Sequence, residues 1–248
     1  MSPTVTEAVF AAVADRARPL LTYYGPGAPG AKRADPAIPA QRVGLSAATL
    51  ENWSAKIANY LRDEAGLLPG DSVIVDLPEH WQSAATLLGA WWAGLRVVAP
   101  GDEGAGDARV VFTTADRLDD HPDAEELIAV PLDPFGGRVP GLPAFAGDFG
   151  DTVRPHGDHF SPSGAGPLAL GGLSVNDVLA RSAAAAGAAG ITAGMRVLST
   201  RPWRTGEGIV DHLLAPLVTG AALVWADPVA GLDLPAIAET EKTGLTLG

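Results

Sequence analysis

Two glycine-rich segments carry residue types that could hold a phosphate group. The first is Gly25-x-Gly27-x-x-Gly30, which follows a predicted strand and formally matches the dinucleotide-binding fingerprint. That fingerprint works only when a helix begins inside the loop and points its amino end at the pyrophosphate. Here prolines recur at positions 29, 36 and 39, without helical periodicity or a capping pattern. We therefore interpret residues 25–40 as a surface loop.

The second segment comprises residues 161–167 (SPSGAGP). Small residues allow backbone N–H groups to converge on an anion, and serine hydroxyls add further donors. The candidate ligand-binding residues are therefore Ser161, Ser163, Gly164 and Gly166, with Ser174 at the start of the next predicted helix. No lysine or arginine lies in the loop, so we expect at most weak binding of AMP or phosphate and no tightly bound cofactor. A flexible linker between two lobes is the alternative interpretation.

Histidines and carboxylates lie close together just before this loop, at His156, His159, Asp151 and Asp158. Two imidazoles and two carboxylates could bind zinc, but their spacing on an irregular segment fixes no coordination geometry. A solvated polar loop is the simpler interpretation, and we expect no metal site.

Motifs of the common hydrolases and nucleotide-binding enzymes are missing. The sequence contains no Gly-x-Ser-x-Gly, His-Glu-x-x-His or Gly-x-x-x-x-Gly-Lys pattern. His80 and His212 lie at or within predicted helices without a partner pattern, which indicates helix-boundary or packing roles. We therefore assign no catalytic residue.

Composition excludes several classes of partner. The 248 residues include 17 Lys+Arg against 29 Asp+Glu, a net charge of -12, which predicts no nucleic acid partner and no anionic membrane surface. The absence of cysteine removes disulfides and thiol chemistry. No stretch reaches the roughly 18 apolar residues of a membrane span. The first residues are typical of an amphipathic helix rather than a secretory signal, so we expect a cytoplasmic protein.

The elements that would position these residues alternate between helices and strands. Thr4-x-x-Glu7 is a capping box that opens a helix to about residue 18, and Ser46 is the predicted N-cap of a helix that ends at Gly66. Apolar runs predict strands at 20–24, 41–45, 72–77, 96–99, 109–113 and 127–130, and a helix at 78–94. Residues 131–167 show no periodicity, which is typical of a connector.

An internal repeat organises these elements. Residues 65–74 (AGLLPGDSVI) match residues 189–198 (AGITAGMRVL), and a proline follows the copies at positions 78 and 202, an offset of 124 residues. Each copy reads strand, capped helix, turn, strand, proline, helix, glycine and strand. That order implies parallel strands joined by right-handed crossovers. Chance similarity in an alanine- and glycine-rich sequence is the alternative.

We therefore predict an α/β fold with two pseudo-symmetric βαβαβ lobes and mainly parallel sheets. The first lobe would span residues 1–150 and include an N-terminal helix. Residues 151–167 would form a Gly/Pro/Ser-rich connector, and residues 168–248 a second, truncated lobe.

The order and spacing of these pieces resemble the first part of the adenylate-forming (AMP-binding) superfamily, which includes acyl-CoA synthetases, peptide-synthetase adenylation domains and luciferases. Its members open with a helix after a short Leu-Ser/Thr, then a Gly-x-x-Pro-Gly-Asp-x-Val strand, then a proline-initiated helix that ends in Ala-Gly. The matching pieces here are Leu45-Ser46, residues 66–73 (GLLPGDSV), Pro78 and Ala93-Gly94. Residues 190–224 and 234–248 are similar to the segments that follow the family's phosphate loop. The resemblance therefore implies a truncated N-terminal domain of this fold.

Departures from the family pattern imply that ligase activity is lost. The family's phosphate loop ends in Pro-Lys-Gly, whereas its counterpart at residues 161–172 lacks the threonines and has apolar residues 168–170 near the lysine position. The family's aromatic/His substrate-pocket segment corresponds to residues 201–204 (RPWR), which contain no histidine. The sequence also ends before the Tyr-Gly-x-Thr-Glu motif, the ribose-binding aspartate and the mobile domain with its catalytic lysine. Each missing contact would cost about two orders of magnitude in rate.

The sequence therefore predicts a degenerate adenylate-forming homologue without ligase activity, which acts as a small-molecule, anion-binding or protein-interaction module. The alternative is an AMP-dependent acyl or aminoacyl ligase fragment that needs a second polypeptide, and hydrolysis at the connector has the least support. We also expect a homodimer. The helix at 79–93 carries no charge after Glu79 and needs burial on all sides. A truncated second lobe would leave the helix around 209–218 and the last strand without some of their usual neighbours, and pairing of two chains would cover that apolar face.

Overall fold

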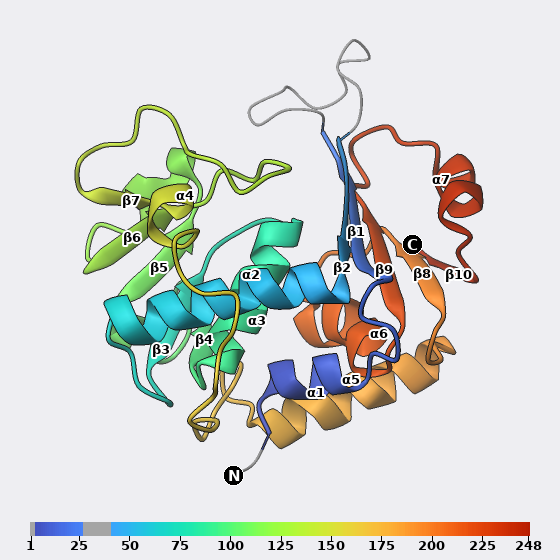
Figure 1. Ribbon diagram of the computed structural model, residues 1–248, viewed down its shortest axis with the longest axis horizontal. Coiled ribbons are helices and arrows are strands. Elements are labelled where there is room, and N and C mark those ends of the chain that lie inside the picture. The colour runs from blue at the N-terminus through green and yellow to red at the C-terminus, as the bar shows by residue number, and fades with distance from the viewer. Residues whose placement is uncertain (1–2, 27–40) are drawn as a thin grey trace.

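The computed structural model describes residues 3–26 and 41–248 and contains two five-stranded sheets flanked by helices (Figure 1). The first sheet has the order β4-β3-β5-β6-β7 and is parallel throughout. The second has the order β10-β8-β9-β1-β2, and only its edge strand β2 is antiparallel. The strands are β1 (Pro19–Gly25), β2 (Gln41–Ser46), β3 (Ser72–Val75), β4 (Arg96–Val98), β5 (Val110–Thr113), β6 (Glu126–Ala129), β7 (Ala146–Asp148), β8 (Arg196–Ser199), β9 (Ala222–Ala226) and β10 (Leu245–Leu247). The predicted fold class is confirmed.

Strand pairing does not follow chain order at the N-terminus. β1 and β2 fall within the predicted first lobe, yet β1 pairs with β9 in the second sheet, with Leu21 opposite Leu223 and Tyr23 opposite Trp225. After Pro19 every residue of β1 is buried, so this strand needs neighbours on both edges and cover on both faces. The lobe boundaries at residues 150 and 167 remain a prediction, although β1 and β2, from the first predicted lobe, both belong to the second sheet.

Helices cover both sheets and begin at caps that the sequence specifies. They are α1 (Val5–Ala11), α2 (Ala47–Asn59), α3 (Trp81–Trp92), α4 (Phe149–Thr152), α5 (Val175–Ala189), α6 (Ala215–Val218) and α7 (Leu234–Glu241), with π-helical turns at Tyr60–Glu64 and Ile209–Leu214. The Thr4 hydroxyl accepts a hydrogen bond from the Glu7 N–H (3.1 Å), and the Ser46 hydroxyl accepts one from the Thr49 N–H (3.1 Å). Among the described helices none is long and apolar enough to cross a membrane.

Several predicted boundaries move. α1 ends at Ala11 instead of near residue 18, and α3 begins at Trp81 instead of Pro78, because His80 is its N-cap. The predicted connector contains regular structure as well, namely β7 and α4. The Asp148 carboxylate organises this part, since it accepts hydrogen bonds from the N–H groups of Val139, Gly150 and Asp151. Such side-chain to backbone bonds leave no hydrophobic period for a sequence pattern to detect.

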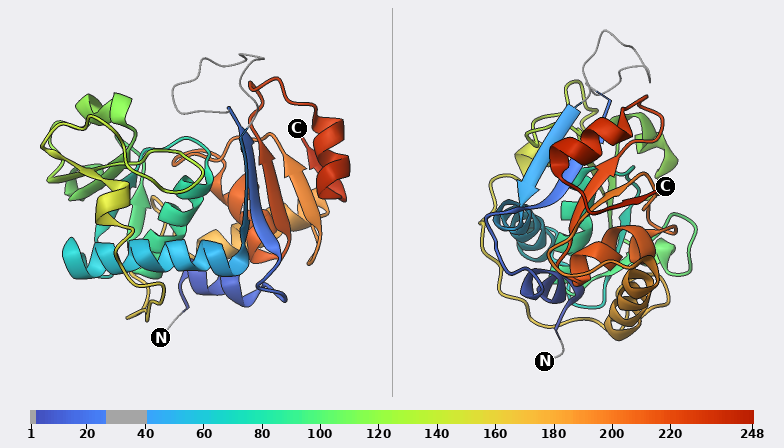
Figure 2. Two further views of the ribbon diagram at one scale, coloured as in Figure 1. Left: turned by 45° about the horizontal axis from the view of Figure 1, so that its top comes forward. Right: turned by 90° about the vertical axis from the view of Figure 1, so that its right-hand side faces the viewer.

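α2 and α3 pack side by side between the two sheets (Figures 1 and 2). Every residue of α3 is buried within this single chain, against α1, α2 and strands of both sheets. The expectation that this helix is buried on all sides is therefore confirmed, and the burial is complete within one chain. Self-association itself stays a prediction.

The internal repeat is real at the level of hydrogen bonds. The strand order β4-β3-β5 recurs as β9-β8-β10. In the first copy the Gly70 N–H donates to the Gly94 carbonyl (2.9 Å), and in the second the Gly194 N–H donates to the Gly220 carbonyl (3.0 Å). The same backbone contact at the same place in both copies favours a structural repeat over chance similarity.

Candidate functional site

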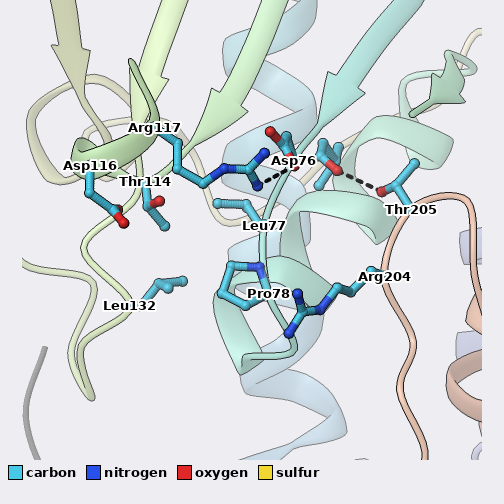
Figure 3. Close-up of a pocket in the computed structure, with 10 residues that line it drawn as sticks. Asp76, Leu77, Pro78, Thr114, Asp116, Arg117, Leu132, Arg204 and Thr205 are labelled. Carbon is cyan, nitrogen blue, oxygen red and sulfur yellow. Dashed lines mark hydrogen bonds and ion pairs between the residues drawn. The ribbon is translucent and has the colours of Figure 1, made fainter. Parts of the chain in front are cut away.

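A cavity of about 380 Å³ lies where the first sheet meets the second copy of the repeat (Figure 3). We call it the crevice. It is lined by Val75, Asp76, Leu77, Pro78, Thr114, Asp116, Arg117, Leu132, Arg204 and Thr205. Ligands of parallel α/β sheets bind at the carboxyl ends of the strands, which is where the crevice is placed.

The first repeat supplies one wall through residues that follow its strands. Asp76 comes directly after β3, and its N–H donates to the Phe112 carbonyl on the neighbouring β5 (2.8 Å). Thr114 and Asp116 follow β5 in the same way. Because β3 and β5 are parallel and adjacent, their carboxyl ends meet at one edge and bring these polar side chains together.

Asp76 is the electrostatic centre of this wall. Its carboxylate accepts from Arg117 Nη1 (2.6 Å) and lies 2.9 Å from His121 Nε2, and its side chain is only 13% exposed. Arg117 Nε also reaches the Asp120 carboxylate at 3.1 Å. This network holds the Arg117 guanidinium in one orientation at the edge of the crevice (Figure 3).

The second repeat closes the opposite side. The Thr205 hydroxyl donates to the Val75 carbonyl (2.6 Å). Glu79 accepts from Arg204 Nε (2.9 Å) and from the Trp203 N–H (3.2 Å). The Glu79 side chain is 4% exposed whereas that of Arg204 is 57% exposed, so the buried carboxylate anchors a guanidinium that solvent can reach.

A row of aromatic rings runs behind this junction. His80 meets Tyr23 edge-on at 4.5 Å, Tyr23 stacks on Trp225 at 5.6 Å, and Trp225 meets Trp203 at 6.2 Å. The His80 Nδ1 accepts from the Gln82 N–H (3.3 Å), which places its proton on Nε2, 3.4 Å from the Gln41 amide oxygen. Burial lowers the pKa of His80 from 6.5 to about 3, so the ring is neutral. The predicted packing role of His80 is thus confirmed.

Leu132 adds a conformational feature to the crevice. Its φ is 53°, and among the described residues only Lys242 shares a left-handed backbone without being glycine. Such a conformation is uncommon for a residue with a Cβ, and it concentrates at functional positions. An aliphatic side chain is thereby held against the crevice at a position where glycine would be less strained.

The glycines of the predicted phosphate loop serve backbone packing. The Gly166 N–H donates to the Gly94 carbonyl (3.0 Å). A Cβ at Gly166 would lie 2.5 Å from Gly70 Cα, and one at Gly94 would lie 2.4 Å from the Gly164 carbonyl oxygen. The loop lies directly on the turn before β3, and the two backbones approach too closely for larger side chains. This packing accounts for glycine at these positions even if no ligand binds there.

The predicted serines are distributed differently. Ser161 and Ser163 are exposed, and the Ser161 carbonyl accepts from Arg62 (3.2 Å). Ser174 forms a capping box with Asp177: its hydroxyl accepts from the Asp177 N–H (3.2 Å) and donates to the Asp177 carboxylate (2.6 Å). The amino end of α5 thus already holds a carboxylate. The assignment of these residues to an anion site stays a prediction.

The histidines of the connector take part in separate contacts. His156 lies 3.0 Å from the Glu64 carboxylate, and Asp158 pairs with Lys56 at 2.5 Å. In the described part of the chain, no group of three or more histidines, aspartates and glutamates is arranged to hold a metal ion.

The motif search missed most of the crevice. Only Arg204 was anticipated, as part of the segment that corresponds to the family's substrate pocket. The available signal was the polar residue after each buried strand: Asp76 after SVIV and Thr114 after VVFT. The sequence predicts that both segments are strands of a parallel sheet, but it does not predict that the two strands lie next to each other.

Comparison with known proteins gives one close relative. The chain is 42% identical over 219 residues to a "TIGR03089 family protein" of Mycobacterium tuberculosis (strain ATCC 25618 / H37Rv), and the match covers 85% of this chain and 84% of the relative. No family model matches the chain.

Solved structures with a similar fold are ligases. The chain is similar to an acyl-CoA synthetase of Brucella canis (18% identity, TM-score 0.68, 99% of this chain and 47% of that chain). It is also similar to the anthranilate CoA ligase AuaEII in complex with anthranoyl-AMP (14%, 0.70, 98% and 49%) and to a fatty acid AMP ligase of Legionella pneumophila (13%, 0.67, 98% and 43%). The chain therefore spans about half the length of these ligases and has the fold of their N-terminal part.

Proposed function

The chain belongs to the TIGR03089 family, and we propose that it is a small-molecule-binding protein built on the adenylate-forming fold, without ligase activity of its own. The crevice is the observation that carries this proposal. It lies at the carboxyl ends of β3 and β5 and is closed by Arg204 and Thr205 from the second copy of the repeat. A ligand there would contact both copies at once.

The lining of the crevice defines the chemistry of the ligand. Arg117 and Arg204 offer guanidinium groups, Asp116 offers a carboxylate, and Leu77, Pro78 and Leu132 provide an apolar surface. Guanidinium groups bind carboxylates and phosphates in a bidentate way. We infer a small organic acid with an apolar body, whose acidic group is held by Arg204.

The segment at the family's lysine position supports the absence of ligase chemistry. Ala169 in this segment is buried against the first sheet, where its carbonyl accepts from the Val97 N–H (2.8 Å) and from Trp91 Nε1 (2.9 Å). The chain has three lysines, and of the two in the described part, Lys56 binds Asp158 and Lys242 lies away from the crevice. In a ligase, a cation at the phosphates stabilises the charge that develops during adenylation, and neither of these two lysines is placed at the crevice to do so.

The proposal is tested by two measurements on the purified chain. Pyrophosphate exchange into ATP, assayed with fatty, aryl and amino acids, is expected to stay at background. A thermal-shift screen of small carboxylic acids is expected to give saturable binding, and Arg204→Gln is expected to weaken it at least about tenfold. Asp116→Asn removes a negative charge that would repel the acidic group of the ligand, so it is not expected to weaken binding. Arg138→Gln is the matched control, because Arg138 is exposed and pairs with Asp151 outside the crevice. Turnover by the chain alone, or binding that Arg204→Gln leaves unchanged, would contradict the proposal.

A partner-dependent ligase is the second candidate. The observation that favours it is the length of the similar ligases: this chain matches only about half of each of them. On this reading, exchange activity would appear when the chain is mixed with a protein that carries the family's later motifs. It would remain absent with each protein alone.

A further inference from the structure

A second cavity, of about 610 Å³, lies away from the crevice, at the amino ends of β1, β8 and β9. Figure 1 shows these ends at the lower edge of the second sheet, opposite the end where β1 finishes. Its walls are the segment at 12–18, the first residues of the three strands and the carboxyl end of α7. We call it the basal cavity.

Three cationic side chains from separate segments line the basal cavity. Arg18 precedes β1, Arg196 is the first residue of β8, and Lys242 directly follows α7. The lining also includes two carboxylates, those of Asp15 and Glu241. In a chain with a net charge of -12, three cations around one cavity are a local excess that needs an explanation.

The Glu241 carboxylate is already neutralised inside the protein. It accepts from Arg196 Nη2 (2.5 Å), Arg42 Nε (2.8 Å) and the Tyr24 hydroxyl (2.7 Å), and its side chain is 4% exposed. Two guanidinium groups thus share one carboxylate, and this cluster keeps a net positive charge at the wall of the cavity. Asp15 is exposed and caps its own turn through the Ala17 N–H (3.0 Å).

The backbone at Lys242 points to a role for its side chain. Lys242 ends α7 in the left-handed conformation, with φ 51°. Glycine is the usual residue at such a helix end, and α5 does end at Gly190 with φ 71°. Lys242 and Leu132, the two left-handed non-glycine residues of the described chain, each line a cavity. A left-handed residue other than glycine that lines a cavity is a candidate functional position.

We propose that the basal cavity binds a small oxyanion with two or more negative charges, of the pyrophosphate or tricarboxylate type. Arg18, Arg196 and Lys242 come from three separate segments and supply the charge. Arg196 is held by Glu241, so its guanidinium is oriented before the anion arrives. The proposal concerns a site separate from the crevice and does not depend on the function proposed for it.

The test is calorimetric titration of the whole chain with pyrophosphate and, separately, citrate, in dilute buffer without phosphate. We expect saturable binding that weakens as salt is added. Stronger binding of pyrophosphate assigns a phosphate ligand, and stronger binding of citrate assigns a carboxylate ligand. Lys242→Gly is expected to weaken binding at least about tenfold, with no loss of thermal stability, because glycine relieves the left-handed backbone. Arg18→Ala is expected to weaken binding without unfolding the chain, since Arg18 is exposed.

Arg109→Ala is the charge-matched control. Arg109 is exposed and pairs with Glu125 beside the first sheet, so its loss is expected to leave anion affinity unchanged. If Lys242 served only to end α7, Lys242→Gly would keep the affinity of the wild-type chain. That result, or the absence of saturable binding of both anions at millimolar concentration, overturns the proposal.

Discussion

Because His80 is buried and neutral in the folded chain, we expect the protein to lose stability in mild acid, by an amount that can be calculated from the pKa shift. Its pKa is about 3 in the folded protein against an ordinary value of 6.5. Between these values the unfolded chain binds a proton that the folded chain does not, so stability falls as pH falls below 6.5. From pH 7.5 to pH 5.5 the loss is about 1.4 kcal/mol. This figure barely depends on the folded pKa, because that value lies far below the window.

The assay is urea unfolding of the wild-type chain and of His80→Asn at both pH values. Asparagine can still cap α3 through its side-chain oxygen, but it does not titrate. The variant is expected to be less stable at pH 7.5, because the smaller side chain leaves the contacts with Tyr23 and Gln41 unfilled. Its further loss on going to pH 5.5 is expected to be about 1.4 kcal/mol smaller than that of the wild type.

His159→Asn is the matched control for this experiment. His159 is exposed, so its removal is expected to leave the pH dependence of stability as in the wild type. An equal pH dependence in the wild-type chain and His80→Asn would refute the reasoning. It would mean that His80 accepts a proton in the folded state without cost and is not held neutral by burial.

Three further predictions concern the connector, the buried ion cluster and association. Gly166→Ala is expected to lower the free energy of unfolding in urea by about 2 kcal/mol, because the added Cβ meets backbone atoms of Gly70 and Gly94. The control Ser163→Ala is expected to leave this free energy unchanged. Glu241→Gln is expected to cost about 3 kcal/mol, since it leaves Arg196 and Arg42 without their shared carboxylate. A cost below 1 kcal/mol would show that solvent replaces the ion pairs. Light scattering coupled to size exclusion is expected to give the mass of a dimer, and a monomer mass unchanged on concentration contradicts this.

The repeat, the capped helices and the parallel strands could be predicted from sequence because each leaves a local pattern. Ser46 and Ser174 precede apolar helical periods, and Gly66 and Gly190 end them. The pairing of β1 with β9 could not be predicted, because the two strands lie about two hundred residues apart and no local pattern specifies such a partner.

The crevice was missed for a related reason. Asp76, Asp116 and Arg204 lie in three separate turns, and no spacing rule connects them. Gly166 has the composition expected of a phosphate cradle, and its small size also allows the close approach of the loop to Gly70. A glycine-rich loop indicates that its backbone closely approaches another group. The sequence alone does not show whether that group is a ligand or another segment of the chain.

The contact between Glu79 and Trp203 fixes the place of the crevice in the symmetry of the fold. These residues are 124 positions apart, which is the offset of the repeat, so each is the counterpart of the other. A contact between counterparts places the two turns side by side. The crevice therefore lies where the turn after β3 meets the turn after β8. A symmetric pair of turns would present the same groups twice. Here one turn has Glu79 where the other has Trp203, so the buried carboxylate of one copy orients Arg204 of the other. If the crevice binds a ligand as proposed, this difference between the two turns would favour one orientation of that ligand.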